Sequence, residues 1–92
     1  MATATEEIEE HRRRGHVVAA RFDRRRRTVC LRLHNGASFS FPVHLAEGLR
    51  GASAAKLAEI EISPSGLGLH WPQLDADLYV PALLQGIFGS TD

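Results

Sequence analysis

The sequence feature that most constrains the fold is the dipeptide Asn35-Gly36, which separates two stretches of alternating apolar and polar residues. Residues 28–34 and 37–43 each place every second side chain on one face, as a strand with one buried face requires. The apolar positions on that face are Val29, Leu31, Leu33, Phe39, Phe41 and Val43. An Asn-Gly pair favours a type I′ turn, because both central residues of that turn have positive φ. The two stretches are therefore predicted to form an antiparallel hairpin.

A third stretch with the same alternation, residues 16–22, precedes the hairpin. Val18, Ala20 and Phe22 are expected on its inward face. The polar residues 23–27 connect it to the hairpin. The first half of the chain therefore predicts a three-stranded antiparallel meander with one apolar face.

The second half of the chain is expected to extend this sheet. Ile60 and Ile62 alternate with acidic residues and predict a fourth strand. Residues 64–66 are a turn signal, after which a fifth strand is predicted to end at Pro72. The inward-facing residues of that strand are Leu67, Leu69 and Trp71.

Two helical segments complete the expected fold. Ser53 is a suitable N-cap for a short helix that ends near Ala58. Pro81 suits the first turn of a C-terminal helix. The apolar residues of that helix recur at helical spacing and are Val80, Leu83, Leu84, Ile87 and Phe88. We therefore predict an α+β domain, with an antiparallel sheet of about five strands and the C-terminal helix packed on one face.

The length of 92 residues is enough for one domain with a modest core. The domain is expected over residues 16–89, followed by a disordered tail over residues 90–92. Residues 1–15 form a charged arm with helical propensity. Ile8 is the only large apolar side chain that this arm can bury, so we expect it to be loosely held.

Three features of the sequence predict a cytoplasmic protein. No apolar run approaches the roughly 20 residues that cross a membrane, and the acidic first ten residues lack the apolar segment of a signal peptide. A single cysteine, Cys30, cannot form an internal disulfide, which fits a reducing compartment.

The charges are distributed unevenly along the chain, although they sum to zero. Residues 1–34 contain nine arginines and five acids, whereas residues 35–92 contain two basic residues and six acids. A surface polarised in this way suits a protein partner or a homodimer. It differs from the uniformly basic surface of a dedicated nucleic-acid binder.

Four segments carry a resemblance to a known family. They are residues 35–42 (NGASFSFP), 49–53 (LRGAS), 61–66 (EISPSG) and 68–78 (GLHWPQLDADL). Over residues 16–89 the chain resembles the bacterial domain of unknown function 2442 family. The resemblance implies a small α+β domain of bacterial origin without an established catalytic activity. It also suggests an antitoxin-like partner role, since members are thought to lie beside small toxin-like genes.

The chain departs from that family's usual pattern in two places. Tyr79 stands where a small polar capping residue is commoner, and the arm over residues 1–15 is extra. The resemblance supplies no catalytic residues.

The segment that follows residue 69 contains the candidate partner-binding residues. They are Trp71, Asp75, Asp77 and Tyr79, an aromatic and acidic group. The structural alternative, which we favour, is that Trp71 packs under the C-terminal helix, while Asp75 and Asp77 bind turn amides and cap that helix. His70 with the two aspartates has the residue types of a metal site, but the chain lacks the spacings of metal motifs, so we expect neither a metal nor a cofactor.

The run Arg24, Arg25, Arg26 and Arg27 is the candidate nucleic-acid contact. Four guanidinium groups at a hairpin tip can reach several phosphates. No aromatic residues are interleaved with them to stack on bases, and no recognition helix is evident, so nucleic acid is the less favoured partner.

The leading prediction for function is a non-enzymatic bacterial module that binds another protein. The alternative is an antitoxin-like regulator that contacts nucleic acid through residues 24–27. A third reading, a small enzyme, requires a concave pocket containing titratable groups with shifted pKa values.

Overall fold

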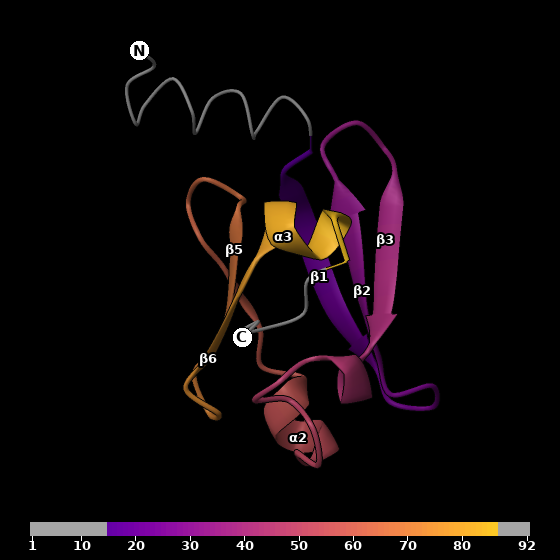
Figure 1. Ribbon diagram of the computed structural model, residues 1–92, viewed down its shortest axis with the longest axis vertical. Coiled ribbons are helices and arrows are strands. Elements are labelled where there is room, and N and C mark those ends of the chain that lie inside the picture. The colour runs from indigo at the N-terminus through magenta and orange to yellow at the C-terminus, as the bar shows by residue number, and fades with distance from the viewer. Residues whose placement is uncertain (1–14, 87–92) are drawn as a thin grey trace.

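The structure, a computed structural model, describes residues 15–86 and confirms the meander predicted for the first half of the chain (Figure 1). Strands β1 (Val17–Asp23), β2 (Thr28–Leu33) and β3 (Ser38–Pro42) pair antiparallel in the order β1-β2-β3. The inward side chains of β2 and β3 are Val29, Leu31, Leu33 and Phe41, with Phe39 partly buried beside them. The alternation of the sequence therefore identifies the buried face of this sheet correctly.

The turn between β2 and β3 is not the type I′ turn that the Asn-Gly pair predicts. Positive φ occurs at Gly36 (89°) but not at Asn35. The Gly36 amide donates to the Leu33 carbonyl at 3.0 Å, and the Asn35 side chain accepts from the Ala37 amide at 3.0 Å. The loop is thus a turn closed by one left-handed glycine, which is the next commonest way to connect a hairpin.

A bulge in β1 changes which of its residues face the core. Val17 is opposite Leu33, but Ala19 is opposite Arg32, so one extra residue lies between the two pairs. The prediction placed Val18 inside, whereas Val17 is buried and Val18 is half exposed. Beyond the bulge, Ala20 and Phe22 pack against the core as expected.

The prediction of one sheet with about five strands is wrong, because the strands form two three-stranded sheets. Strands β4 (Glu61–Ile62), β5 (Gly68–Trp71) and β6 (Ala76–Tyr79) pair antiparallel in the order β4-β5-β6. Strand β6 was not predicted, and Asp75 and Asp77 were expected to bind turn amides and to cap the C-terminal helix. In the structure Asp75 has a φ of 49°, and the chain reverses there to form the third strand of the second sheet.

The two sheets meet where β1 begins. The Val17 amide donates to the Gly66 carbonyl at 2.8 Å, so the turn before β5 is anchored to the first sheet. Gly66 has a φ of 76°, and a Cβ there would lie 2.9 Å from the Val17 carbonyl oxygen. Glycine is required at this junction both for its backbone conformation and for the close approach.

Helix α3 (Val80–Leu84) lies between the two sheets in the view of Figure 1. It buries Val80 and Leu83, and Pro81 lies in its first turn as predicted. Tyr79 is its N-cap residue and makes no side-chain capping hydrogen bond. Ile87 and Phe88, which the prediction assigned to this helix, lie outside the described residues, as do residues 1–14 of the charged arm.

Two short helices cover the ends of the strands below α3 (Figure 1). The 3-10 helix η1 (Val43–Leu45) follows β3, and α2 (Ala54–Leu57) precedes β4. Ser53 caps α2 as predicted, since its side chain accepts from the Lys56 amide. In the described part of the chain, no helix has the length and apolar character needed to cross a membrane.

Candidate functional site

Trp71 belongs to the core and not to a binding surface. Its side chain has no exposed area, and its indole Nε1 donates to the carbonyl oxygen of Leu57, the last residue of α2, at 3.2 Å. Trp71 was a candidate partner-binding residue, but its burial instead agrees with the favoured alternative, in which its side chain packs in the core. Position 71 faces inward because β5 alternates, with Leu69 and Trp71 toward the core and His70 outward.

The other three candidate partner-binding residues are exposed at the second sheet. Asp77 and Tyr79 lie on the outer face of β6, and Asp75 lies in the turn before it. Neither aspartate caps α3, because the N-cap residue is Tyr79 and it has no side-chain cap. The prediction of aspartate caps is wrong, since residues 76–79 form a strand and separate the aspartates from the helix.

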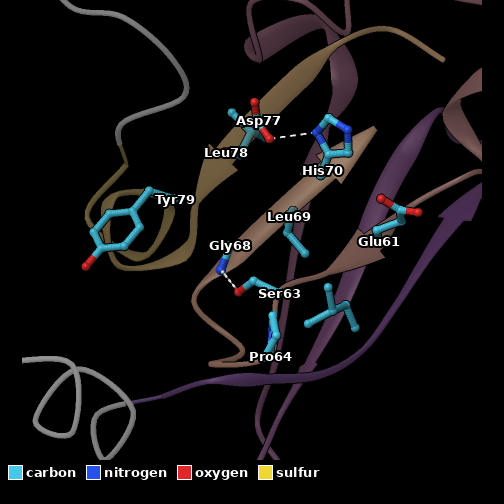
Figure 2. Close-up of a pocket in the computed structure, with 10 residues that line it drawn as sticks. Glu61, Ser63, Pro64, Gly68, Leu69, His70, Asp77, Leu78 and Tyr79 are labelled. Atoms are coloured by element: carbon cyan, nitrogen blue, oxygen red, sulfur yellow. Dashed lines mark hydrogen bonds and ion pairs between the residues drawn. The ribbon is translucent and has the colours of Figure 1, made fainter. Parts of the chain in front are cut away.

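A row of three ionisable side chains crosses this outer face. His70 pairs with Glu61 on one side and with Asp77 on the other in the strand register. The His70 Nδ1 and Asp77 Oδ1 atoms are 2.7 Å apart, which is a short hydrogen bond (Figure 2). The hydrogen bond to Asp77 raises the pKa of His70, and the charges of Asp77, Glu61 and Asp75 act in the same direction.

The next row of the face has a glycine at its centre. Gly68 pairs with Tyr79 on β6, and its carbonyl oxygen accepts from the Ser63 amide on the other side. The Ser63 hydroxyl accepts from the Gly68 amide at 2.9 Å and is within 3.2 Å of the Ser65 hydroxyl. In Figure 2, Gly68 lies between Tyr79 and Ser63, and the Ser63 hydroxyl lies against the Gly68 amide that donates to it.

These two rows line an open groove with a volume of about 800 Å³. Its lining residues are Glu61, Ile62, Ser63, Pro64, Gly68, Leu69, His70, Asp77, Leu78 and Tyr79. We call this site the β5 groove. The absence of a side chain at Gly68 shapes the floor of this groove. The backbone of β5 is extended at Gly68 and does not itself require glycine.

Sequence reasoning found only part of the β5 groove. It named Asp77 and Tyr79 and considered His70 beside the aspartates in a recognition or metal site, but it missed Glu61, Ser63 and Gly68. The pairing of His70 with Asp77 depends on the register of β5 and β6. The sequence signal for β6 is the alternation of residues 76–79, in which Ala76 and Leu78 face inward.

Metal binding finds no support in the described region. Within residues 15–86, no three histidine, cysteine, aspartate or glutamate side chains are grouped so that they could hold a metal ion. His70 and Asp77 instead bind each other directly.

The arginines of the β1–β2 turn are not equivalent. Arg27 has a φ of 48°, and its guanidinium donates to the Ala52 carbonyl oxygen at 2.8 Å, so it ties the turn to the loop before α2. The Asp23 carboxylate accepts from the backbone amides of Arg25 and Arg26 and orders the turn. All four arginines are exposed, and Arg27 additionally has this structural contact.

The exposed turn arginines lie at one end of a second polar surface, the outer face of the first sheet. Arg21 is opposite Cys30 in the register, and Arg32 is opposite Ser38. A shallow depression of about 430 Å³ lies over these residues. The first sheet therefore presents basic side chains, whereas the second sheet presents acidic ones, in agreement with the uneven charge of the sequence.

Comparison with known proteins gives a family but no activity. The family described as "Protein of unknown function (DUF2442)" matches residues 17–89. No curated protein matches the chain.

Two solved structures are similar to the chain. A crystal structure of a protein of unknown function from Rhodospirillum rubrum is 47% identical, with a TM-score of 0.79, and the match covers 84% of this chain and 93% of that one. A solution structure of an uncharacterised protein from Chromobacterium violaceum is 29% identical, with a TM-score of 0.84, and the match covers 97% of this chain and 83% of that one. The chain therefore belongs to the family of proteins of unknown function DUF2442.

Proposed function

We propose that this chain is a non-enzymatic module that binds another protein through the β5 groove. The observation that carries the proposal is the composition of the groove, whose lining includes the half-exposed Tyr79, the carboxylate of Asp77 and the bare backbone of Gly68. Exposed tyrosines are enriched in protein interfaces, because one ring offers both an apolar surface and a hydrogen-bonding group. The groove is also open, so it can accept a segment of a macromolecule.

An enzyme requires a concave site that contains a titratable group with a shifted pKa. The β5 groove meets both requirements, because it is lined by His70, whose pKa is raised. Ser63, His70 and Asp77 all line it, and the contact between His70 Nδ1 and Asp77 resembles two members of a serine hydrolase triad. A nucleophilic serine must hydrogen-bond the histidine. The Ser63 hydroxyl instead bonds the Gly68 amide and the Ser65 hydroxyl, and among the described residues His70 is not one of its partners. These contacts favour binding over catalysis.

The proposal is tested by placing a photo-crosslinking amino acid, p-benzoylphenylalanine, at Tyr79 in the native host. The matched position is Ser40, an exposed residue on the outer face of the first sheet. We expect irradiation to attach one discrete protein at position 79 and not at position 40. A crosslinked protein at position 40 alone, or none at either position, would contradict the assignment of the groove as the binding site.

A second candidate function is nucleic-acid binding in an antitoxin-like regulator. The observation that favours it is that Arg21 and Arg32 extend the basic surface of Arg24, Arg25 and Arg26 along the first sheet. Phosphate contacts of this kind bind without base specificity and weaken as salt rises. This candidate uses the face that does not contain the β5 groove, so the crosslinking experiment separates the two functions.

A further inference from the structure

The charged groups that line the β5 groove are carboxylates, together with one histidine. Glu61 lies on β4 and Asp77 on β6, and the lining includes no lysine or arginine. Asp75, in the turn before β6, adds negative charge near His70. A ligand segment that enters this groove is therefore favoured when it carries positive charge.

The arrangement of Asp77 and Tyr79 selects among cationic side chains. Asp77 uses Oδ1 for His70, and three-quarters of its side chain remains exposed, so its carboxylate has acceptor capacity for a further donor. Tyr79 follows two residues later on the same face, and its cross-strand partner Gly68 carries no side chain. A guanidinium is planar, so it can donate to a carboxylate and stack on an aromatic ring at the same time. The compact ammonium of lysine lacks that second, planar contact.

We propose that the β5 groove binds an arginine side chain carried by an extended segment of the partner protein. The guanidinium lies over Gly68, donates to Asp77 and stacks on the Tyr79 ring, while Glu61 adds long-range attraction. This inference rests on the proposed function, because it names the chemistry of the partner at the same site.

The probe is the blocked peptide Ac-Ser-Arg-Ser-Arg-Ser-Arg-amide. Its controls are the same peptide with citrulline, the neutral isostere of arginine, and the same peptide with lysine. Each peptide is titrated into the full-length, ¹⁵N-labelled protein while amide chemical shifts are recorded. We expect the arginine peptide to move the amide signals of Gly68, His70, Asp77 and Tyr79, and to bind about tenfold more tightly than the citrulline peptide. The lysine peptide is expected to fall between them.

Matched variants locate the effect. Asp77→Asn and Tyr79→Ala should each weaken arginine-peptide binding about tenfold, since one removes a charged hydrogen-bond acceptor and the other removes the ring. Glu59→Gln removes an acidic charge that does not line the groove and should leave binding unchanged. The dispersion of the spectrum reports whether each variant is folded.

Equal binding of the arginine and citrulline peptides, shifts confined to the first sheet, or no binding at millimolar peptide would overturn the inference. The failure of the inference and that of the proposed function remain distinguishable. If a protein crosslinks at position 79 but the arginine peptide binds no more tightly than the citrulline peptide, the proposed function stands and only the arginine inference fails.

Discussion

His70 and Asp77 are seven residues apart in the sequence and form a 2.7 Å hydrogen bond across neighbouring strands. The pair lies on the outer face of the second sheet, next to Glu61 in the same row. Together with Glu61, the pair places one ionisable side chain from each of β4, β5 and β6 in a row that lines the β5 groove. The chemistry of the site therefore depends on a strand register.

The first prediction concerns the titration of His70. Asp77→Asn replaces the carboxylate that raises the pKa of His70 with a neutral amide, so we expect this pKa to fall toward its ordinary value of 6.5 in the variant. Proton NMR of the imidazole C–H signals across a pH series measures the change directly. An unchanged His70 titration would show that the 2.7 Å contact is not maintained in solution.

The same pair predicts a pH dependence of stability. The folded-state pKa of His70 is raised, so the stabilisation from this pair is complete below the ordinary pKa and is lost as pH rises through the folded-state pKa. Asp77→Asn should therefore lower the free energy of unfolding more at about pH 5 than at about pH 9. Urea denaturation at both values measures this difference. A larger loss at the higher pH would reverse the sign and contradict the account.

The indole of Trp71 predicts a core effect. Trp71→Phe leaves the Leu57 carbonyl without its donor and reduces the volume of a side chain that has no exposed surface. We expect the free energy of unfolding to fall by about 2–4 kcal/mol. Val18→Ala, at a half-exposed apolar residue of the bulge, should change it by less than about 0.5 kcal/mol. Similar losses in the two variants would mean that Trp71 does not complete the core.

Gly66 tests the junction between the sheets. Gly66→Ala introduces a left-handed alanine whose Cβ would lie 2.9 Å from the Val17 carbonyl oxygen, whereas Gly36→Ala introduces one with no atom within 4 Å. Both variants carry the backbone penalty of about 1–2 kcal/mol. Gly66→Ala should lose about 1–3 kcal/mol more, because the backbone of β1 must move. Equal losses in thermal or urea unfolding would show that the contact between Val17 and Gly66 does not hold the sheets together.

The arginines of the β1–β2 turn are predicted to differ in their effect on stability. Arg27→Ala removes the guanidinium that donates to Ala52 and should destabilise the fold by about 1 kcal/mol. The double variant Arg24→Ala with Arg25→Ala should leave the stability within about 0.5 kcal/mol of the original. If the second candidate function holds, that double variant also loses salt-sensitive retention on double-stranded DNA. Unchanged retention would remove the nucleic-acid candidate.

Several elements of the fold could be predicted because their signals are local. The alternation of residues 28–34 and 37–43 correctly places the buried face of the first sheet, and Ser53 caps α2 as its side-chain chemistry predicts. Val18 was misplaced because a bulge arises from the fit between two strands, and one extra residue reverses which side chains face inward. The strand β6 was missed because four residues between a turn and a helix give a short pattern.

The β5 groove was harder to predict than the fold. Asp77 and Tyr79 were identified from their residue types, an acidic and an aromatic side chain near a turn. The same reasoning selected Trp71, which is buried because it faces inward on β5 and donates to the Leu57 carbonyl. The floor of the groove is a missing side chain, Gly68, and it acquires meaning only through its cross-strand neighbour Tyr79. Register between distant strands is a tertiary property, so residues read singly do not reveal it.

The most direct test of the groove as the binding site uses the partner that crosslinking identifies, purified in its free form. The measured quantity is its affinity for two matched variants of this protein. Gly68→Val fills the floor of the groove, where the nearest atom to a new Cβ is the Ser63 hydroxyl oxygen at 3.2 Å. Ser40→Val adds the same side chain to the outer face of the first sheet, away from the groove. Calorimetric titration should show a Kd raised at least about tenfold by Gly68→Val and unchanged by Ser40→Val. A Kd unchanged by Gly68→Val, or raised only by Ser40→Val, would contradict the central claim.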